Sequence, residues 1–324
     1  MGSISRAAVV LCLTALGLAV AQVAQEDIPT LKVDVNIVNI LFAVHDKRGG
    51  LVGNLDKDAF QVFEDGKEQS IRYFARETDL PLTIGLLIDV SRSMENLIEV
   101  EKRAADQFLT GVLRPKDMAF IISFGPEAEL LQDFTNSRKL LRAALNDLRV
   151  RAPLPTSAIT GNPGPVPTAA KGKGTVLYDA VTLGASDRLR KEVGRKAIVV
   201  ISDGVDSGSS YSIRDAIEAA HKSDAIIYGI YYSDPQYAMF GGGEGELKRM
   251  AEDTGGRVFR ISRKHTLADI FSQIQEEMRS QYAIGYTPSN SVRDGSFRKV
   301  EIRTKQKDLR VRARKGYYAM PERA

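Results

Sequence analysis

The sequence is poor in the residues that usually carry redox or zinc chemistry. Its 324 residues include one cysteine, three histidines and no tryptophan. Cys12 lies inside an apolar run near the N-terminus, so a chain cleaved after Ala21 would contain no cysteine. Redox chemistry and thiolate metal sites are then excluded, and the core alone must hold the fold. The histidines fall in separate segments without ligand spacing, which argues against a zinc hydrolase.

Long apolar runs are also scarce, apart from one at the N-terminus. Residues 1–21, MGSISRAAVVLCLTALGLAVA, have Arg6 as their only charge, then an apolar run that is short for a bilayer span, then the triplet Ala19-Val20-Ala21. This pattern is typical of a cleaved signal peptide, so we expect export to the periplasm, the outer envelope or the medium. An uncleaved N-terminal anchor is the alternative.

Charge is distributed unevenly along the chain. The net charge is +4, yet the segment from Arg298 to Arg323 carries ten Lys and Arg against three acids. In RKVEIRTKQKDLRVRARKG, apolar residues alternate with charged ones in a period of two, which predicts a pair of strands with one solvated face. The alternative is a patch that binds anionic lipid or glycan of the envelope surface, or nucleic acid, but no interleaved aromatic residues support nucleic acid.

Three regions differ in their pattern. Residues 31–80 predict short strands separated by the turns KRGG and DGKE. In residues 82–280, apolar strands such as TIGLLID and KAIVVIS alternate with amphipathic helices, which predicts an α/β, Rossmann-like doubly wound, mostly parallel sheet. Residues 281–320 return to strands. Since neither β region has enough strands for its own core, we expect the two flanks to form one small β-sandwich.

The first helix of the α/β region is predicted from its apolar residues. They recur at helical spacing and should face the core: Leu97, Val100, Ala104, Phe108 and Val112.

Polar residues of three segments are expected at one edge of the predicted sheet. Asp89, Ser91 and Ser93 end TIGLLIDVSRSM, Thr175 lies at a helix start in KGTVLYDA, and Asp203 follows KAIVVIS. Functional groups gather beyond the carboxyl ends of strands in an open parallel sheet, and carboxylate and hydroxyl oxygens suit a hard cation such as Mg2+. Taken singly, the serines could instead cap a helix and Asp203 could belong to an ordinary turn. Together, the five residues predict a metal site.

The pattern D-x-S-x-S, then Thr, then Asp-Gly, resembles the metal-ion-dependent adhesion site of von Willebrand factor type A domains over about 200 residues. The segments GTVLYDA and GYYA further resemble secreted acidobacterial-type relatives. The resemblance implies that Ser91, Ser93 and Thr175 offer hydroxyl oxygens to Mg2+, Mn2+ or Ca2+. It also implies that Asp89 and Asp203 coordinate directly or through water. An Asp or Glu of a protein partner would fill the open position.

The resulting hypothesis is an exported, adhesion-type binding module that is not an enzyme. A dehalogenase-like phosphatase needs a second acid where Ser91 stands, and KGKGT has Gly174 where a phosphate loop requires Ser or Thr. The alternative is a structural or assembly component of the envelope in which the metal only stabilises the fold. The segment 152–174, rich in Pro and Gly, predicts a loop that is functional or disordered.

Overall fold

The computed structural model describes residues 37–76, 80–150, 174–232 and 242–321, all of which belong to one compact unit. The expected signal peptide lies outside these residues, as does the loop expected at 152–174 except for Gly174. Among the described residues, no helix combines the length and the apolar character needed to cross a membrane.

A six-stranded sheet forms the centre of the α/β region. Its strand order is β10-β9-β8-β5-β6-β7, and every neighbouring pair is parallel except β6 with β7. The strands are β5 (Leu82–Asp89), β6 (Met118–Phe124), β7 (Ala128–Thr135), β8 (Arg195–Ser202), β9 (Ala225–Tyr231) and β10 (Val258–Arg260). All residues of β5 and β8 are buried, as expected for strands covered on both faces.

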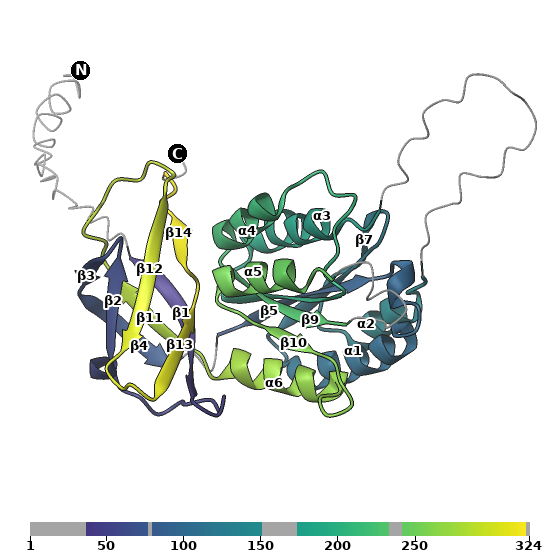
Figure 1. The fold of residues 1–324 in the computed structure, drawn as a ribbon, viewed down its shortest axis with the longest axis horizontal. Helices are drawn as coiled ribbons and strands as arrows, with labels where there is room; N and C mark the ends of the chain where they lie inside the picture. Colours follow the sequence, from purple (N-terminus) through teal and green to yellow (C-terminus); the bar gives the residue numbers. More distant parts are fainter. Residues whose placement is uncertain (1–36, 77–79, 151–173, 233–241, 322–324) are drawn as a thin grey trace, which may run out of the picture. The chain divides into compact units, whose positions relative to one another are not determined.

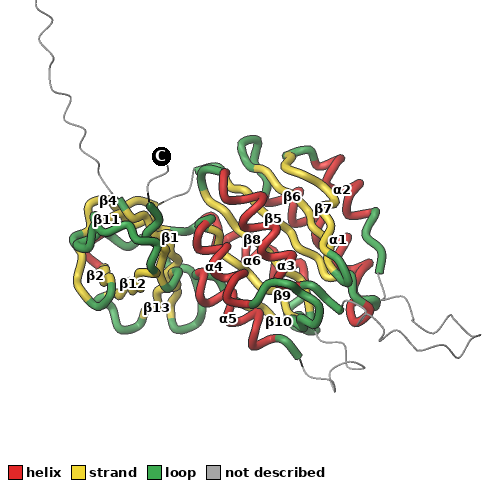
Figure 2. Tube along the Cα trace, turned by 90° about the horizontal axis from the view of Figure 1, so that it is seen from above, coloured by secondary structure: helices red, strands yellow, loops and turns green. Residues whose placement is uncertain are grey.

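Helices cover both faces of this sheet (Figure 1, Figure 2). One face packs against α1 (Ile98–Val112), α2 (Arg138–Asn146) and α6 (Leu267–Arg279). The other packs against α3 (Leu177–Thr182), α4 (Ile213–Lys222) and α5 (Glu244–Thr254). The doubly wound, mostly parallel sheet predicted from the sequence is therefore confirmed.

The flanking segments form two antiparallel four-stranded sheets, with strand orders β13-β1-β11-β4 and β14-β12-β2-β3. From the N-terminal flank come β1 (Val38–Asp46), β2 (Phe60–Glu64), β3 (Lys67–Gln69) and β4 (Ile71–Arg76). From the C-terminal flank come β11 (Tyr282–Tyr286), β12 (Phe297–Thr304), β13 (Leu309–Ala313) and β14 (Gly316–Tyr318). Because β1 pairs with both β11 and β13, and β2 with β12, the predicted shared sandwich is confirmed.

An aromatic cluster fills the core of the sandwich. The Phe42 ring stacks on Tyr282 at 5.4 Å and meets Phe60 edge-on at 5.0 Å, and the Phe74 ring also stacks on Tyr282, at 5.6 Å. The Tyr282 hydroxyl donates to the Val52 carbonyl oxygen at 3.0 Å, so its polar end is satisfied inside the core. Residues from both flanks therefore build one core.

One detail of α1 differs from the prediction. Val100, which was expected to face the core, is 41% exposed, whereas Glu101 is 0% exposed. Leu97, Glu101 and Ala105 follow one another at the helical spacing of four and are all buried. Val100 lies just beside this stripe, so the helix is rotated slightly from the predicted orientation and takes an acid into the core.

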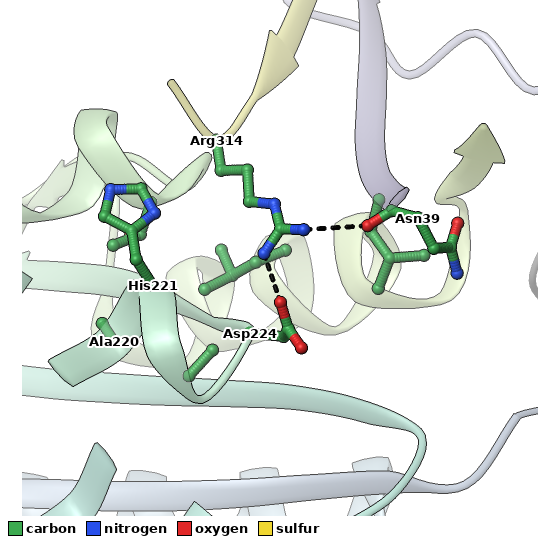
Figure 3. A pocket seen from close by; sticks show the side chains of 9 residues that line it. Asn39, Ala220, His221, Asp224 and Arg314 are labelled. Carbon is green, nitrogen blue, oxygen red and sulfur yellow. Dashed lines mark hydrogen bonds and ion pairs between the residues drawn. The ribbon is translucent and has the colours of Figure 1, made fainter. Parts of the chain in front are cut away.

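The basic C-terminal strands are partly neutralised within the chain. Arg312 pairs with Glu277 at 3.4 Å, Arg314 with Asp224, and Lys315 with Asp253. Figure 3 shows the Arg314 guanidinium between Asp224 and the backbone oxygen of Asn39, which accepts a hydrogen bond at 2.9 Å. The cavity beside it measures about 30 Å³, room for a water but not for a larger ligand. These three basic residues therefore bind acids of the α/β region, an outcome that neither sequence-based alternative included.

The division into separate domains remains a prediction, which truncation can test. Deleting residues 281–324 removes both neighbours of β1 and the β12 partner of β2, so the remaining strands should expose apolar faces and aggregate. A fragment of residues 82–280 should stay soluble and folded. Size-exclusion chromatography and circular dichroism measure both outcomes. A soluble deletion variant with an unchanged spectrum would show that the two flanks fold independently.

Candidate metal site

Asp89 occupies the carboxyl end of the central strand β5. Its neighbour across the sheet is the end of β8, since Ile88 pairs with Ile201. The Ser202 hydroxyl donates to Asp89 Oδ2 at 2.6 Å, and the Ser91 backbone N–H donates to Oδ1 at 2.9 Å. The side chain is 0% exposed. Asp89 is therefore a fully buried carboxylate whose hydrogen-bond partners are neutral donors.

The loop after Asp89 brings two hydroxyl groups together. The Ser91 and Ser93 Oγ atoms are 3.1 Å apart, and both residues are partly buried. A one-turn helix at Arg92–Met94 shapes the loop, and the fully buried Met94 anchors it to the core. Ser91 makes no side-chain capping bond to this turn, and the N-cap residue of α1 is Leu97. The capping interpretation of these serines is therefore not supported.

Asp203 follows β8 and forms a turn, as the simpler sequence interpretation predicted. Its Oδ1 atom accepts a hydrogen bond from the Val205 N–H at 3.0 Å. Gly204 adopts a φ of +76°, and a Cβ there would lie 2.3 Å from the Gly243 carbonyl oxygen. Only glycine fits this position without strain. The turn also keeps Asp203 close enough to Asp89 for its charge to act on that carboxyl group.

The segment that carries Thr175 is attached to the loop after Asp203. The Thr175 carbonyl oxygen accepts hydrogen bonds from the N–H groups of Ser207 (3.0 Å) and Gly208 (3.1 Å). Thr175 lies two residues before α3, and the Tyr178 N–H at the start of that helix donates to Asp206 Oδ1 at 3.2 Å. Backbone contacts therefore bring the third predicted segment to the same edge of the sheet.

The electrostatics of Asp89 reflect its burial. Removal from water raises the pKa of Asp89 to about 7, the hydrogen bonds from Ser202 and Ser91 oppose that rise, and the charge of Asp203 adds to it. The carboxyl groups of Asp89 and Asp203 thus lie close enough to repel each other when both are ionised. No positively charged side chain of the described residues is among the groups that shift the pKa of Asp89. A bound cation would relieve this repulsion.

The predicted residues fit a hard divalent cation. They offer two carboxylates and three hydroxyl oxygens, the ligand type that Mg2+, Mn2+ and Ca2+ prefer. In the part of the chain that the structure describes, no three His, Cys, Asp or Glu side chains are grouped to hold a metal. A site at this edge must therefore depend on the hydroxyl groups. The metal and its five ligands stay a prediction.

Two residues at this edge were missed by the sequence prediction. Ser202 comes directly before Asp203, and its contact with Asp89 depends on the pairing of β5 with β8, which the sequence alone does not give. Glu101 was overlooked because Val100 was taken as the core position. An acid four residues after Leu97, on an otherwise apolar stripe, was the available signal.

A comparison with protein families matches residues 84–205 to the model of the von Willebrand factor type A domain. The matched segment is less than half of the chain, and it contains all five predicted metal ligands. Domains of this type generally mediate protein–protein interactions. A comparison with curated proteins gave no match.

Several solved structures resemble the chain at low sequence identity. An aerotolerance-related membrane protein from Bacteroides fragilis is 17% identical, with a TM-score of 0.45 over 61% of this chain and 98% of that one. BatB from Bacteroides thetaiotaomicron is 19% identical, with a TM-score of 0.43 over 61% and 97%. Proximal thread matrix protein 1 from the mussel byssus, with a zinc-occupied MIDAS motif, is 15% identical, with a TM-score of 0.46 over 67% and 50%.

Asp89 predicts a pH dependence of the metal-free protein. Because its folded pKa of about 7 exceeds the ordinary 3.8, the folded chain binds the proton more tightly than the unfolded chain. Its contribution to stability is complete below pH 3.8 and is lost as the pH rises through about 7, up to about 4 kcal/mol in all.

Urea unfolding in EDTA at several pH values measures this loss as the difference between wild type and Asp89→Asn. As the pH rises, the free energy of unfolding of wild type should fall relative to that of Asp89→Asn. The other titrating groups are the same in both proteins, so their effects largely cancel in the difference. Parallel pH profiles for the two proteins would contradict the burial of an uncompensated carboxylate at this position.

Proposed function

We propose that this chain, which contains a von Willebrand factor type A domain, is an exported binding module that captures an acidic side chain of another protein through a divalent cation. The ligands would be Asp89, Ser91, Ser93, Thr175 and Asp203. The observation that carries the proposal is the buried Asp89 carboxylate at the sheet edge, close to Asp203 and next to a pair of hydroxyl groups. The family match over the same residues supports it.

The serines and the aspartates have different roles in this proposal. Ser91 and Ser93 supply neutral oxygens already held 3.1 Å apart, so little reorganisation is needed on binding. Asp89 and Asp203 supply negative charge, and the bonds from Ser202 and Ser91 N–H fix the orientation of Asp89. The bound cation supplies positive charge and an open coordination position. A partner carboxylate then binds at this open position.

The function is binding and not catalysis. Domains of this type generally serve in interactions, which supports this choice. Export follows from the N-terminal pattern of residues 1–21. The exposed remainder of the basic C-terminal strands stays available for contact with an anionic envelope surface.

Metal binding should stabilise the folded chain. Because the ligands converge only in the folded state, Mg2+ should raise the melting temperature in proportion to the logarithm of its concentration above the dissociation constant. Asp89→Ala should abolish this rise. Differential scanning calorimetry with and without EDTA measures it. The absence of divalent-ion binding to wild type at millimolar Mg2+ or Mn2+ would refute the metal site.

A second candidate is a structural role in the envelope, in which the metal only stabilises the fold. The complete burial of Asp89 favours it, since a cation beside this carboxylate would stabilise the central strand even without a partner. The two functions differ in what happens at the open coordination position. Only the binding function needs that position and a carboxylate on the partner.

Thr175→Ala separates the two functions because it removes one neutral oxygen without changing the formal charge. For binding, the variant should lose most capture of partners from envelope extract while its melting temperature falls by only a few degrees. Thr182→Ala is the control, as it makes the same chemical change at the end of α3.

Capture should also fail in EDTA and after the acidic groups of the extract have been converted to amides. In the structural role the order reverses: EDTA and Thr175→Ala lower stability and leave association intact. Association that survives both treatments would exclude the binding function even if metal is bound.

A further inference from the structure

Glu101 is an acid in an unusual environment. It lies in the first turn of α1, is 0% exposed, and shares the buried face of the helix with the core residues Ala105 and Phe108. Among the described residues, neither of its carboxyl oxygens has a hydrogen-bond partner. Burial of an unpaired carboxyl group costs several kcal/mol in general, whereas an apolar side chain of similar size would stabilise the same position.

Other buried acids of the described chain do have partners. Glu277 contacts Arg257 at 3.0 Å, His45 at 3.2 Å and Arg312 at 3.4 Å. Asp117 accepts hydrogen bonds from the N–H groups of Leu82 and Arg114, both at 2.9 Å, and forms an ion pair with Arg279. Glu64 accepts hydrogen bonds from the hydroxyl groups of Tyr286 and Tyr317. These buried acids thus have hydrogen-bond or ion-pair partners that stabilise the fold. Glu101 differs from them because its carboxyl oxygens have no such partner among the described residues.

The position of Glu101 connects it with the candidate metal site. The helix that carries it begins at Ile98, five residues after Ser93, so the metal-binding loop leads directly into it. Burial raises the pKa of Glu101 well above its usual value, and the charge of Asp89 raises it further. Asp89 therefore interacts with two other acids, Asp203 and Glu101, and Arg or Lys is absent from the described partners of Asp89 and Glu101.

We propose that Glu101 is a charge-balancing residue of the metal site, which strengthens the attraction for a divalent cation by acting through Asp89 and without ligating the metal. This inference rests on the proposed function. Without the cation, burial favours the protonated form of Glu101. A bound cation favours the ionised form, whose negative charge attracts the metal across a low-dielectric interior. The buried acid lowers the stability of the metal-free chain. It raises the affinity of the site for divalent ions and its preference for them over monovalent ions.

The test compares two substitutions on the same helix. Glu101→Gln keeps the shape of the side chain and prevents its ionisation. Glu99→Gln makes the same substitution two residues earlier, at an exposed side chain that pairs with Lys102, and is the matched control. Isothermal titration with Mg2+ and with Mn2+ measures affinity, and calorimetric unfolding in EDTA measures the stability of the metal-free chain.

The proposal predicts opposite effects of Glu101→Gln on the two quantities. The dissociation constant for both ions should rise about tenfold or more, while the melting temperature in EDTA should stay the same or rise. Glu101→Met should show the same pair of changes with a larger rise in melting temperature. Glu99→Gln should change the dissociation constant less than about twofold, because its exposed charge is screened.

Three outcomes would overturn the proposal. If Glu101→Gln binds Mg2+ and Mn2+ as wild type does, Glu101 has no part in the site. If affinity and metal-free melting temperature fall together in both Glu101 variants, the role of the residue is structural. If wild type itself binds neither ion, the proposed function fails as well, whereas the first two outcomes leave it intact.

Discussion

Burial of the Asp89 carboxylate at the end of β5 is the constraint on which the organisation of this edge depends. A charge removed from water must be offset, and the chain offers Asp89 only neutral donors, from Ser202 and the Ser91 N–H, with a second acid, Asp203, near it. The surrounding loops are fixed by backbone hydrogen bonds and by the close approach of Gly204 to Gly243. Backbone contacts thus hold the loops of this edge in place, and among the described residues no side-chain cation offsets the charge of its two acids. Both features suit a preorganised cation site.

A buried acid with positively charged partners lies where the sandwich contacts the helices. Glu277 of α6 is equally buried, but a histidine and two arginines surround it, and they hold its pKa below the usual value although burial acts to raise it. Arg314 and Lys315 extend these contacts through Asp224 and Asp253. The basic excess of the C-terminal strands therefore joins the sandwich to the acidic remainder of the chain. One chain thus contains acids neutralised by its own cations and acids left for an external one.

Much of this arrangement could be predicted from the sequence, because strand ends and hydrophobic periods are local signals. Asp89 and Asp203 were placed at strand ends by the apolar runs before them, and the alternating pattern of the flanks gave the sandwich. The contact of Ser202 with Asp89 depends on the register of two strands more than a hundred residues apart, and the pairs of Arg312 and Arg314 depend on tertiary packing. The sequence prediction placed Val100 in the core in place of Glu101, because a small rotation of α1 about its axis decides which of the two is buried. Such long-range or rotational details have no local signature.

The most direct measurement is anomalous diffraction from crystals of the protein soaked in Mn2+. The proposed site predicts a single strong anomalous peak at the carboxyl edge of the central sheet, at ~2.0–2.6 Å from the Oγ atoms of Ser91 and Ser93. The same peak should vanish in Asp89→Ala crystals. A map without a peak at this edge, or with its peak on other acids such as Asp224 or Asp253, would contradict the account.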